Sequence, residues 1–156
     1  LTEWRLALAA EGAALVKCAG AEAVSEVEKL LPRMPERGRI GAAGALAAQG
    51  SEPGFKALGA ALGSKNKYLR FEAAQQLAVC GRAQAEPLLL RALKDRSQWP
   101  RRAALGGLGR VGGRKSVAAL KRCAKSDRRE DLRSEARWAL EEIRKRIGRP
   151  AARRHK

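Results

Sequence analysis

Histidine is almost absent from this chain of 156 residues, since the only one, His155, is the next-to-last residue. Metal binding or acid–base catalysis that depends on histidine is therefore not expected. Cysteine is also scarce, and Cys18, Cys80 and Cys123 lie far apart without a C-x-x-C pair, which argues against a disulfide scaffold and a zinc site. We expect no metal, no cofactor and a reducing, cytoplasmic location.

Aromatic residues make up only 4% of the sequence, although 45% of it is hydrophobic. A core built from Ala, Leu and Val is therefore expected, and stretches rich in Ala, Leu, Arg and Glu favour helix over strand. Uncharged apolar runs of about 18 residues are missing, so we expect no membrane span. The start, LTEWRLALAAEG, lacks the basic residues that open a secretory signal. Because the chain opens on Leu rather than Met, it is left open whether it is a fragment.

Negative charge is in short supply, with 16 Asp and Glu against 33 Lys and Arg, a net charge of +17. The imbalance is uneven along the chain. Residues 1–31 hold three basic and five acidic side chains, whereas residues 99–131 hold ten and three. Such an asymmetry concerns binding partners rather than the fold.

An internal repeat of about 31 residues runs through the chain. Five columns keep this step: Arg39, Arg70, Arg101 and Arg133; Leu15, Leu46, Leu77, Leu108 and Leu140; Val27, Leu58, Leu89 and Leu120; Leu31, Leu62 and Leu93; and Gly50, Gly81 and Gly112. Each unit reads as two helices, as in NKYLRFEAAQQLAVCG, where Asn66 is a plausible N-cap and Gly81 a stop. One repeat domain is expected over 1–147. It divides into a degenerate cap 1–35, repeats 36–66, 67–98 and 99–131, and a closing helix 132–147, followed by a basic, disordered tail 148–156.

The glycines of GGLGRVGGRK, residues 106–115, imitate a nucleotide-binding loop, since Gly107, Gly109 and Gly112 spell G-x-G-x-x-G. A dinucleotide fingerprint needs a preceding strand, but residues 99–108 read as helix. Gly112 stands in the column of Gly50 and Gly81, where we expect a left-handed residue at a helix end. Gly109 is expected to let neighbouring helices approach. The glycines are therefore interpreted as helix punctuation, that is, as residues that end helices or let them pack closely, and not as a nucleotide-binding loop.

The Asp-x5-Arg junctions DRSQWPR and DRREDLR, each followed by a small-residue helix such as RRAALGGLG, resemble HEAT-like repeats of the short variety named after phycobilisome lyases. The resemblance implies an all-α fold, a right-handed α-solenoid of about four and a half two-helix repeats. It also implies that Asp and Arg hydrogen-bond across repeats as a ladder. Its members here are Arg39, Arg70, Arg101, Arg133, Asp95 and Asp127. Ser64 and Arg33 interrupt the Asp column, so the ladder is expected to be complete only toward the C-terminus.

Catalysis finds little support in the sequence, because the acidic residues are scattered and no histidine could activate Ser or Cys. We therefore expect no enzyme. HEAT-like DNA glycosylases hold a lesion with tryptophans and an Asp, but Trp4, Trp99 and Trp138 fall in different repeat positions, although Asp95 is near Trp99. Bilin lyase activity would rest on the name of the subfamily alone.

Basic residues recur on the second helices of repeats 67–98 and 99–131, whereas Ala60 and Gly63 leave repeat 36–66 without them. Arg91 and Arg122 follow the core leucines by two residues and Lys94 and Lys125 by five, so they lie about 200° and 140° round the helix from the core. Because second helices line the concave surface in HEAT-like solenoids, the resemblance predicts a basic concave patch. Its members are Arg91, Lys94, Lys121, Arg122 and Lys125.

A second basic cluster, RKRIGRPAARRHK, begins with Arg144, Lys145 and Arg146. Basic residues at a helix C-terminus are also favoured by the helix dipole, so both clusters have an ordinary structural explanation. Two functions remain: a scaffold that binds an acidic protein or peptide, or a protein that binds the phosphate backbone of nucleic acid without reading sequence. No membrane partner is expected, and the sequence leaves the oligomeric state open.

Overall fold

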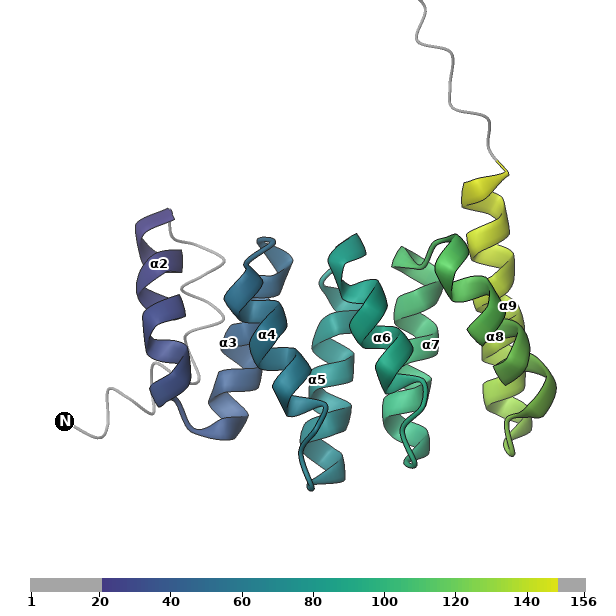
Figure 1. Cartoon of the computed structure of the whole chain (residues 1–156), viewed down its shortest axis with the longest axis horizontal. Helices are drawn as coiled ribbons and strands as arrows, with labels where there is room; N and C mark the ends of the chain where they lie inside the picture. Colours follow the sequence, from purple (N-terminus) through teal and green to yellow (C-terminus); the bar gives the residue numbers. More distant parts are fainter. Residues whose placement is uncertain (1–20, 149–156) are drawn as a thin grey trace, which may run out of the picture.

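The computed structural model describes residues 21–148, and every regular element among them is a helix. The helices stack in two layers along one axis (Figure 1). In chain order they are α2 Ala21–Leu30, η1 Leu31–Arg33, α3 Glu36–Ala48, α4 Glu52–Ala61, α5 Lys67–Val79, η2 Ala83–Ala85, α6 Glu86–Ala92, α7 Gln98–Val111, α8 Arg114–Ser126 and α9 Glu130–Ile147. The all-α solenoid predicted from the repeat is confirmed. Within residues 21–148 none of the helices combines the length and the apolar character needed to cross a membrane.

The helices fall within the expected repeats. Repeats 36–66, 67–98 and 99–131 hold two α-helices each, although α7 begins one residue early, at Gln98, and the closing helix begins at Glu130. Most of the expected cap, residues 1–20, and the tail from residue 149 lie outside the described residues. Cys18 and Trp4 are among them.

Leucines of two repeat columns form the core between the layers. Leu46, Leu77 and Leu108 come from one set of helices, and Leu58, Leu89 and Leu120 come from the other. All six side chains are fully buried. Cys80 is buried as well, as expected of a core cysteine.

The ends of the helices follow the expected chemistry with one exception. The side-chain oxygen of Asn66 accepts a hydrogen bond of 2.9 Å from the N–H of Tyr68, which confirms the predicted N-cap. Gly50 and Gly81 have positive φ angles of 85° and 68°, as predicted. The prediction is wrong for Gly112, whose φ is −63°. A Cβ there would lie 2.5 Å from the carbonyl oxygen of Leu108, so space rather than backbone conformation requires this glycine.

The two layers differ in how closely their helices pack. Helices α3, α5, α7 and α9 pack directly on one another, whereas α4, α6 and α8 have few mutual contacts. Glycines permit the close approach: a Cβ on Gly107 would lie 2.9 Å from Cα of Ala78, and one on Gly109 would lie 2.3 Å from the ring of Trp138. We call α3, α5, α7 and α9 the inner layer and α4, α6 and α8 the outer layer.

A stack of helix pairs curves toward its more tightly packed layer, so the inner layer lies on the concave side. The prediction that the second helices line the concave surface is therefore wrong. Helices α6 and α8, which carry the predicted basic patch, belong to the outer layer; Figure 1 shows them in front of α7 and α9.

Candidate functional site

Arg70 and Asp95 form a buried ion pair across two repeats. Nε of Arg70 donates to Oδ2 of Asp95 at 2.7 Å, and Nη2 donates to Oδ1 at 3.1 Å. The side chains are only 7% and 9% exposed. Nη1 donates to the carbonyl oxygens of Ser64 and Lys65, so the guanidinium also closes the turn before its own helix. The pairing of Asp and Arg implied by the resemblance is present here.

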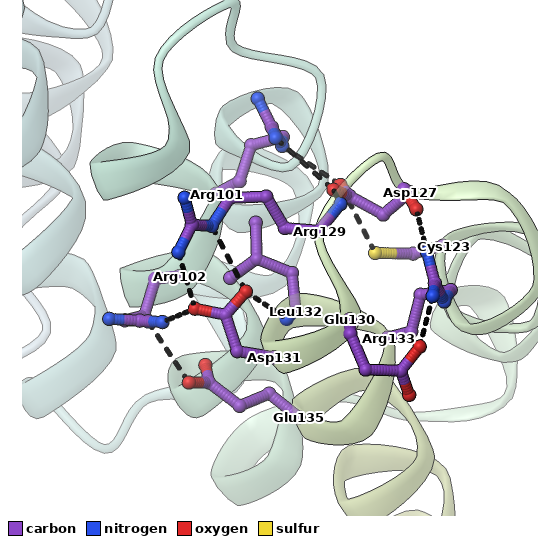
Figure 2. A network of polar contacts seen from close by, with 10 residues as sticks. All are labelled: Arg101, Arg102, Cys123, Asp127, Arg129, Glu130, Asp131, Leu132, Arg133 and Glu135. Atoms are coloured by element: carbon purple, nitrogen blue, oxygen red, sulfur yellow. Dashed lines mark hydrogen bonds and ion pairs between the residues drawn. The ribbon is translucent and has the colours of Figure 1, made fainter.

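Arg101 and Asp127 repeat this arrangement one unit later (Figure 2). In both aspartates Oδ1 also accepts a backbone N–H two residues on, from Ser97 and from Arg129. Burial alone would raise the pKa of Asp95, but the hydrogen bonds from Arg70 and Ser97 outweigh it and hold that pKa below its usual value. The same balance of burial against donors lowers the pKa of Asp127.

The ladder stops at both ends of the described solenoid. Arg133 donates to the carbonyl oxygen of Asp127 and pairs with Glu130 of its own helix. Arg39 donates to the carbonyl oxygens of Pro32 and Met34, but its Nε has no hydrogen-bond partner among the described residues. The ladder thus has two complete rungs, both toward the C-terminal end.

The remaining acidic and thiol groups of this region are held in unreactive states. Hydrogen bonds from Arg137 and Arg133 lower the pKa of Glu130, and a hydrogen bond from Arg129 lowers that of Asp131. Burial, together with the charge of Asp127, raises the pKa of Cys123 to about 11, so the thiol stays protonated at neutral pH. Residues 21–148 contain no group of three His, Cys, Asp or Glu side chains arranged to hold a metal ion.

The turn between α7 and α8, which imitates a phosphate-binding loop in sequence, binds a side chain of the protein itself. Oε1 of Glu86 accepts the backbone N–H of Gly113 at 2.8 Å and the hydroxyl of Ser116 at 2.6 Å. Gly107 and Gly109 lie inside α7 and give space to Ala78 and Trp138. The carboxylate of Glu86 thus takes the donors that a phosphate would need. Gly112 and Gly113 lie between the two helices, as the interpretation as helix punctuation requires, whereas Gly107 and Gly109 serve helix packing.

The basic strip is our name for Arg91, Lys94, Lys121, Arg122 and Lys125. All five are exposed on α6, on α8 or in the turn after α6. None forms an ion pair within the described part of the chain, and α8 contains five basic residues and no acidic one. The five residues of the basic strip therefore lie together on the outer layer, which forms the convex side of the solenoid.

One cleft opens between α6 and α8, and another opens at the N-terminal end, where α2, η1, α3 and α4 meet. One cleft of about 460 Å³ lies between α6 and α8, with Leu90, Leu93 and Ala119 beside Lys94 and Arg122. Cys123, Ser126 and Asp127 complete its lining. The other, of about 660 Å³, lies between η1 and α4 and is lined mainly by apolar residues, with Glu28, Glu36 and Glu52 among them. Between α4 and α6, Leu88 packs over Gly59 and Arg91 packs over Gly63.

The C-terminal cluster divides into different roles. Arg146 donates to the carbonyl oxygens of Gly109 at 2.6 Å and of Gly112 at 2.7 Å, so it caps the end of α7. Lys145 pairs with Glu142 at 2.8 Å. Only Arg144 is exposed without a partner among the described residues. Arg146, which was predicted to bind an anion, thus has a structural role at the end of α7.

One group of exposed residues escaped the sequence reasoning. The turns that hold the ladder line up along one edge of the solenoid, at the bottom of Figure 1, and we call this the ladder edge. Lys65, Arg96 and Arg128 are exposed in successive turns of this edge, and Tyr68 and Trp99 stand just beyond two of them. The 31-residue step from Tyr68 to Trp99 was the signal that could have found them.

Two stacked layers of paired helices, crossed by Arg–Asp rungs, define an α-solenoid repeat protein. A family model described as HEAT repeats matches residues 55–141, more than half of the chain. The chain belongs to the HEAT repeat family, whose members form helical scaffolds for protein interactions. The comparison with curated proteins found no match to this sequence.

Proposed function

We propose that this protein is a non-enzymatic scaffold whose basic strip binds an acidic segment of a partner protein. One observation carries the proposal: the cleft between α6 and α8 places the side chains of Leu90 and Leu93 beside the cations of Lys94 and Arg122. A peptide with an apolar side chain flanked by carboxylates matches that combination. Charge would steer the partner to the strip, and the apolar contact would slow its release.

The state of the carboxylates supports a role without catalysis. A general acid at neutral pH needs a raised pKa, whereas the pKa values of Asp95, Asp127, Glu130 and Asp131 are all lowered by arginine or backbone donors. Asp95, the aspartate nearest in sequence to Trp99, is committed to Arg70. These contacts belong to structural ion pairs.

The test measures binding of a labelled acidic peptide that contains one leucine, by fluorescence anisotropy. Lys121→Gln with Arg122→Gln should weaken binding about tenfold, since Arg122 lines the cleft and Lys121 is its neighbour in the basic strip. Arg114→Gln with Lys115→Gln removes the same charge from the N-terminal turn of the same helix and serves as the matched control. Replacing the leucine of the peptide by serine should also weaken binding.

Equal losses for the two double variants would show an attraction that depends on net charge alone and would overturn the proposal. So would a peptide whose affinity does not change when its leucine is replaced. Binding to the phosphate backbone of nucleic acid is the second candidate, and it is favoured by the exposed cations and rings of the ladder edge.

A further inference from the structure

Every turn along the ladder edge presents cations to solvent. These exposed side chains are Arg33, Lys65, Lys67, Lys94, Arg96, Lys125 and Arg128. Within residues 21–148 none of them forms an ion pair or donates a side-chain hydrogen bond. The two aspartates of these turns, Asp95 and Asp127, are committed to Arg70 and Arg101. The edge is therefore a row of free cations.

Acidic residues near the edge do not neutralise this row. Glu130 pairs with Arg133, and Asp131 pairs with Arg102 and Arg129 (Figure 2). Glu130 also pairs with Arg137. Glu36, at the start of α3, is exposed and has no arginine partner between residues 21 and 148. Among the described residues it is the only such carboxylate at the start of an inner helix. The positive charge thus runs on from turn to turn between Ser64 and Arg128.

Two aromatic rings accompany the cations. Tyr68 is 63% exposed and Trp99 is 45% exposed, and each is the second residue of an inner helix. The ammonium group of Lys67 lies 5.1 Å from the centroid of the Tyr68 ring. Because they stand at one repeat position of neighbouring inner helices, the two rings offer flat faces on which a partner can stack.

Trp99 is also held in place before any partner arrives. Its ring centroid lies 6.1 Å from that of Phe71, and the guanidinium of Arg102 lies 5.8 Å from the ring. Arg102 in turn pairs with Asp131 and Glu135 of α9. A ring fixed in this way loses little entropy when a flat group stacks on it.

We propose that the ladder edge binds single-stranded nucleic acid, with phosphates on the row of cations and bases stacked on Tyr68 and Trp99. Adjacent helices lie about 8–10 Å apart, so the turns offer cations at a repeating interval that an extended strand can follow. Stacking on aromatic rings tolerates any base, which fits a surface with no other means of reading sequence. A duplex keeps its bases stacked inside and could not use the rings.

This site goes beyond the scaffold function proposed above and lies on a different surface, although Lys94 and Lys125 belong to both. The test therefore leaves those two lysines unchanged. A labelled oligothymidine and a duplex of equal length are titrated with the whole chain at about 50 to 300 mM salt, and anisotropy is followed. The single strand should bind more tightly, with log K falling by about 0.7 per phosphate contact against log salt.

Double variants separate the contribution of the ladder edge to binding from the effect of net charge. Lys65→Gln with Arg96→Gln should lower the affinity for the single strand at least tenfold and reduce the salt slope by about 1.4, which corresponds to two phosphate contacts. Arg114→Gln with Lys115→Gln, at the opposite edge, removes the same charge and should change the affinity much less. Lys121→Gln with Arg122→Gln, which tests the scaffold function, should also leave strand binding nearly intact.

A ring variant tests the stacking. Tyr68→Ala should weaken binding about fivefold or more without changing the salt slope, and Tyr68→Phe should restore it. Four outcomes would overturn the proposal: no binding at the lowest salt, equal losses for the edge and control pairs, an unchanged affinity in Tyr68→Ala, or displacement of the strand by polyglutamate at lower concentration than by unlabelled strand. The last would assign the edge to an acidic polypeptide.

Discussion

Arg39 and Ser64 take the positions that Arg70 and Asp95 fill one repeat later, and the rung between them is missing. Ser64 keeps one half of the aspartate's role, because its hydroxyl oxygen accepts the N–H of Asn66, as Oδ1 of Asp95 accepts the N–H of Ser97. It offers no second oxygen, and Nε of Arg39 is left without a hydrogen-bond partner among the described residues.

Ser64→Asp should therefore complete the ladder. One carboxylate oxygen would keep the hydrogen bond from the N–H of Asn66, and the other would accept a hydrogen bond from Arg39. The added hydrogen bond should stabilise the fold by about 1–2 kcal/mol. Urea unfolding followed by circular dichroism measures the change. Ser64→Asn supplies the turn acceptor without the charge and should gain much less, and equal gains for Asn and Asp would contradict this explanation.

Asp95→Asn should destabilise the protein by about 2–3 kcal/mol, because it removes the charge that compensates a buried guanidinium while it keeps the turn acceptor. Asp131→Asn is the control, since the pair of Asp131 with Arg102 is 38% exposed on both sides and should matter far less. The same urea titration compares the two variants. Similar losses for both would show that burial does not set the strength of these pairs.

Acid should weaken the fold through the two rungs. The pKa values of Asp95 and Asp127 are lower in the folded protein, so their contribution is complete above the unfolded value of about 3.9 and is lost as pH falls through the folded values. The free energy of unfolding should change little from pH 7 to about 5 and then fall below about pH 4. Combining Asp95→Asn with Asp127→Asn should flatten that fall, and an unchanged profile would assign it to other groups.

Neighbouring glycines of α7 should respond to alanine with opposite signs. At Gly106 a Cβ would meet only Nη2 of Arg110, 4.0 Å away, so Gly106→Ala should stabilise by about 0.5–1 kcal/mol through helix propensity. At Gly107 it would lie 2.9 Å from the backbone of Ala78, so Gly107→Ala should cost about 1–3 kcal/mol. The melting temperatures of the two variants measure these changes. A higher melting temperature for both variants would refute the close packing of α5 on α7.

Arg146→Gln should lower stability by about 1 kcal/mol and leave binding of acidic peptide and of single-stranded nucleic acid unchanged, because this guanidinium caps the carbonyl groups at the end of α7. Arg144→Gln removes the same charge from an exposed position and should not change the melting temperature. A variant of Arg146 that melts normally would show that the cap contributes nothing.

The repeat in the sequence located the helices because each core leucine returns after one unit. Leu77 and Leu108, read 31 residues apart, are both fully buried where the layers meet. The same period could not tell which layer is concave, since curvature depends on how closely each layer packs. The close packing of the inner layer depends on Gly107, whose missing side chain lets α7 approach Ala78. Gly107 does not belong to a column of glycines, so the repeat did not point to it.

Contacts between distant residues were the part that sequence reasoning lacked. The rungs were anticipated only because the Asp-x5-Arg junctions resemble those of HEAT-like repeats, which implies such pairs. Arg146 was not recognised as a cap, because its acceptors on Gly109 and Gly112 lie 37 and 34 residues earlier. Glu86 was missed for the same reason, since its bond to Gly113 has no counterpart in the repeat.

Gly59 of α4 and Gly63 in the turn after α4 both lie where α6 packs against the preceding repeat. Because they let Leu88 and Arg91 approach closely, side chains of α6 lie between the mainly apolar cleft at one end and the cleft between α6 and α8 at the other. The residues that line one cleft can therefore be replaced without changing the lining of the other cleft. A protein engineer could redesign one compartment and keep the other as an internal reference.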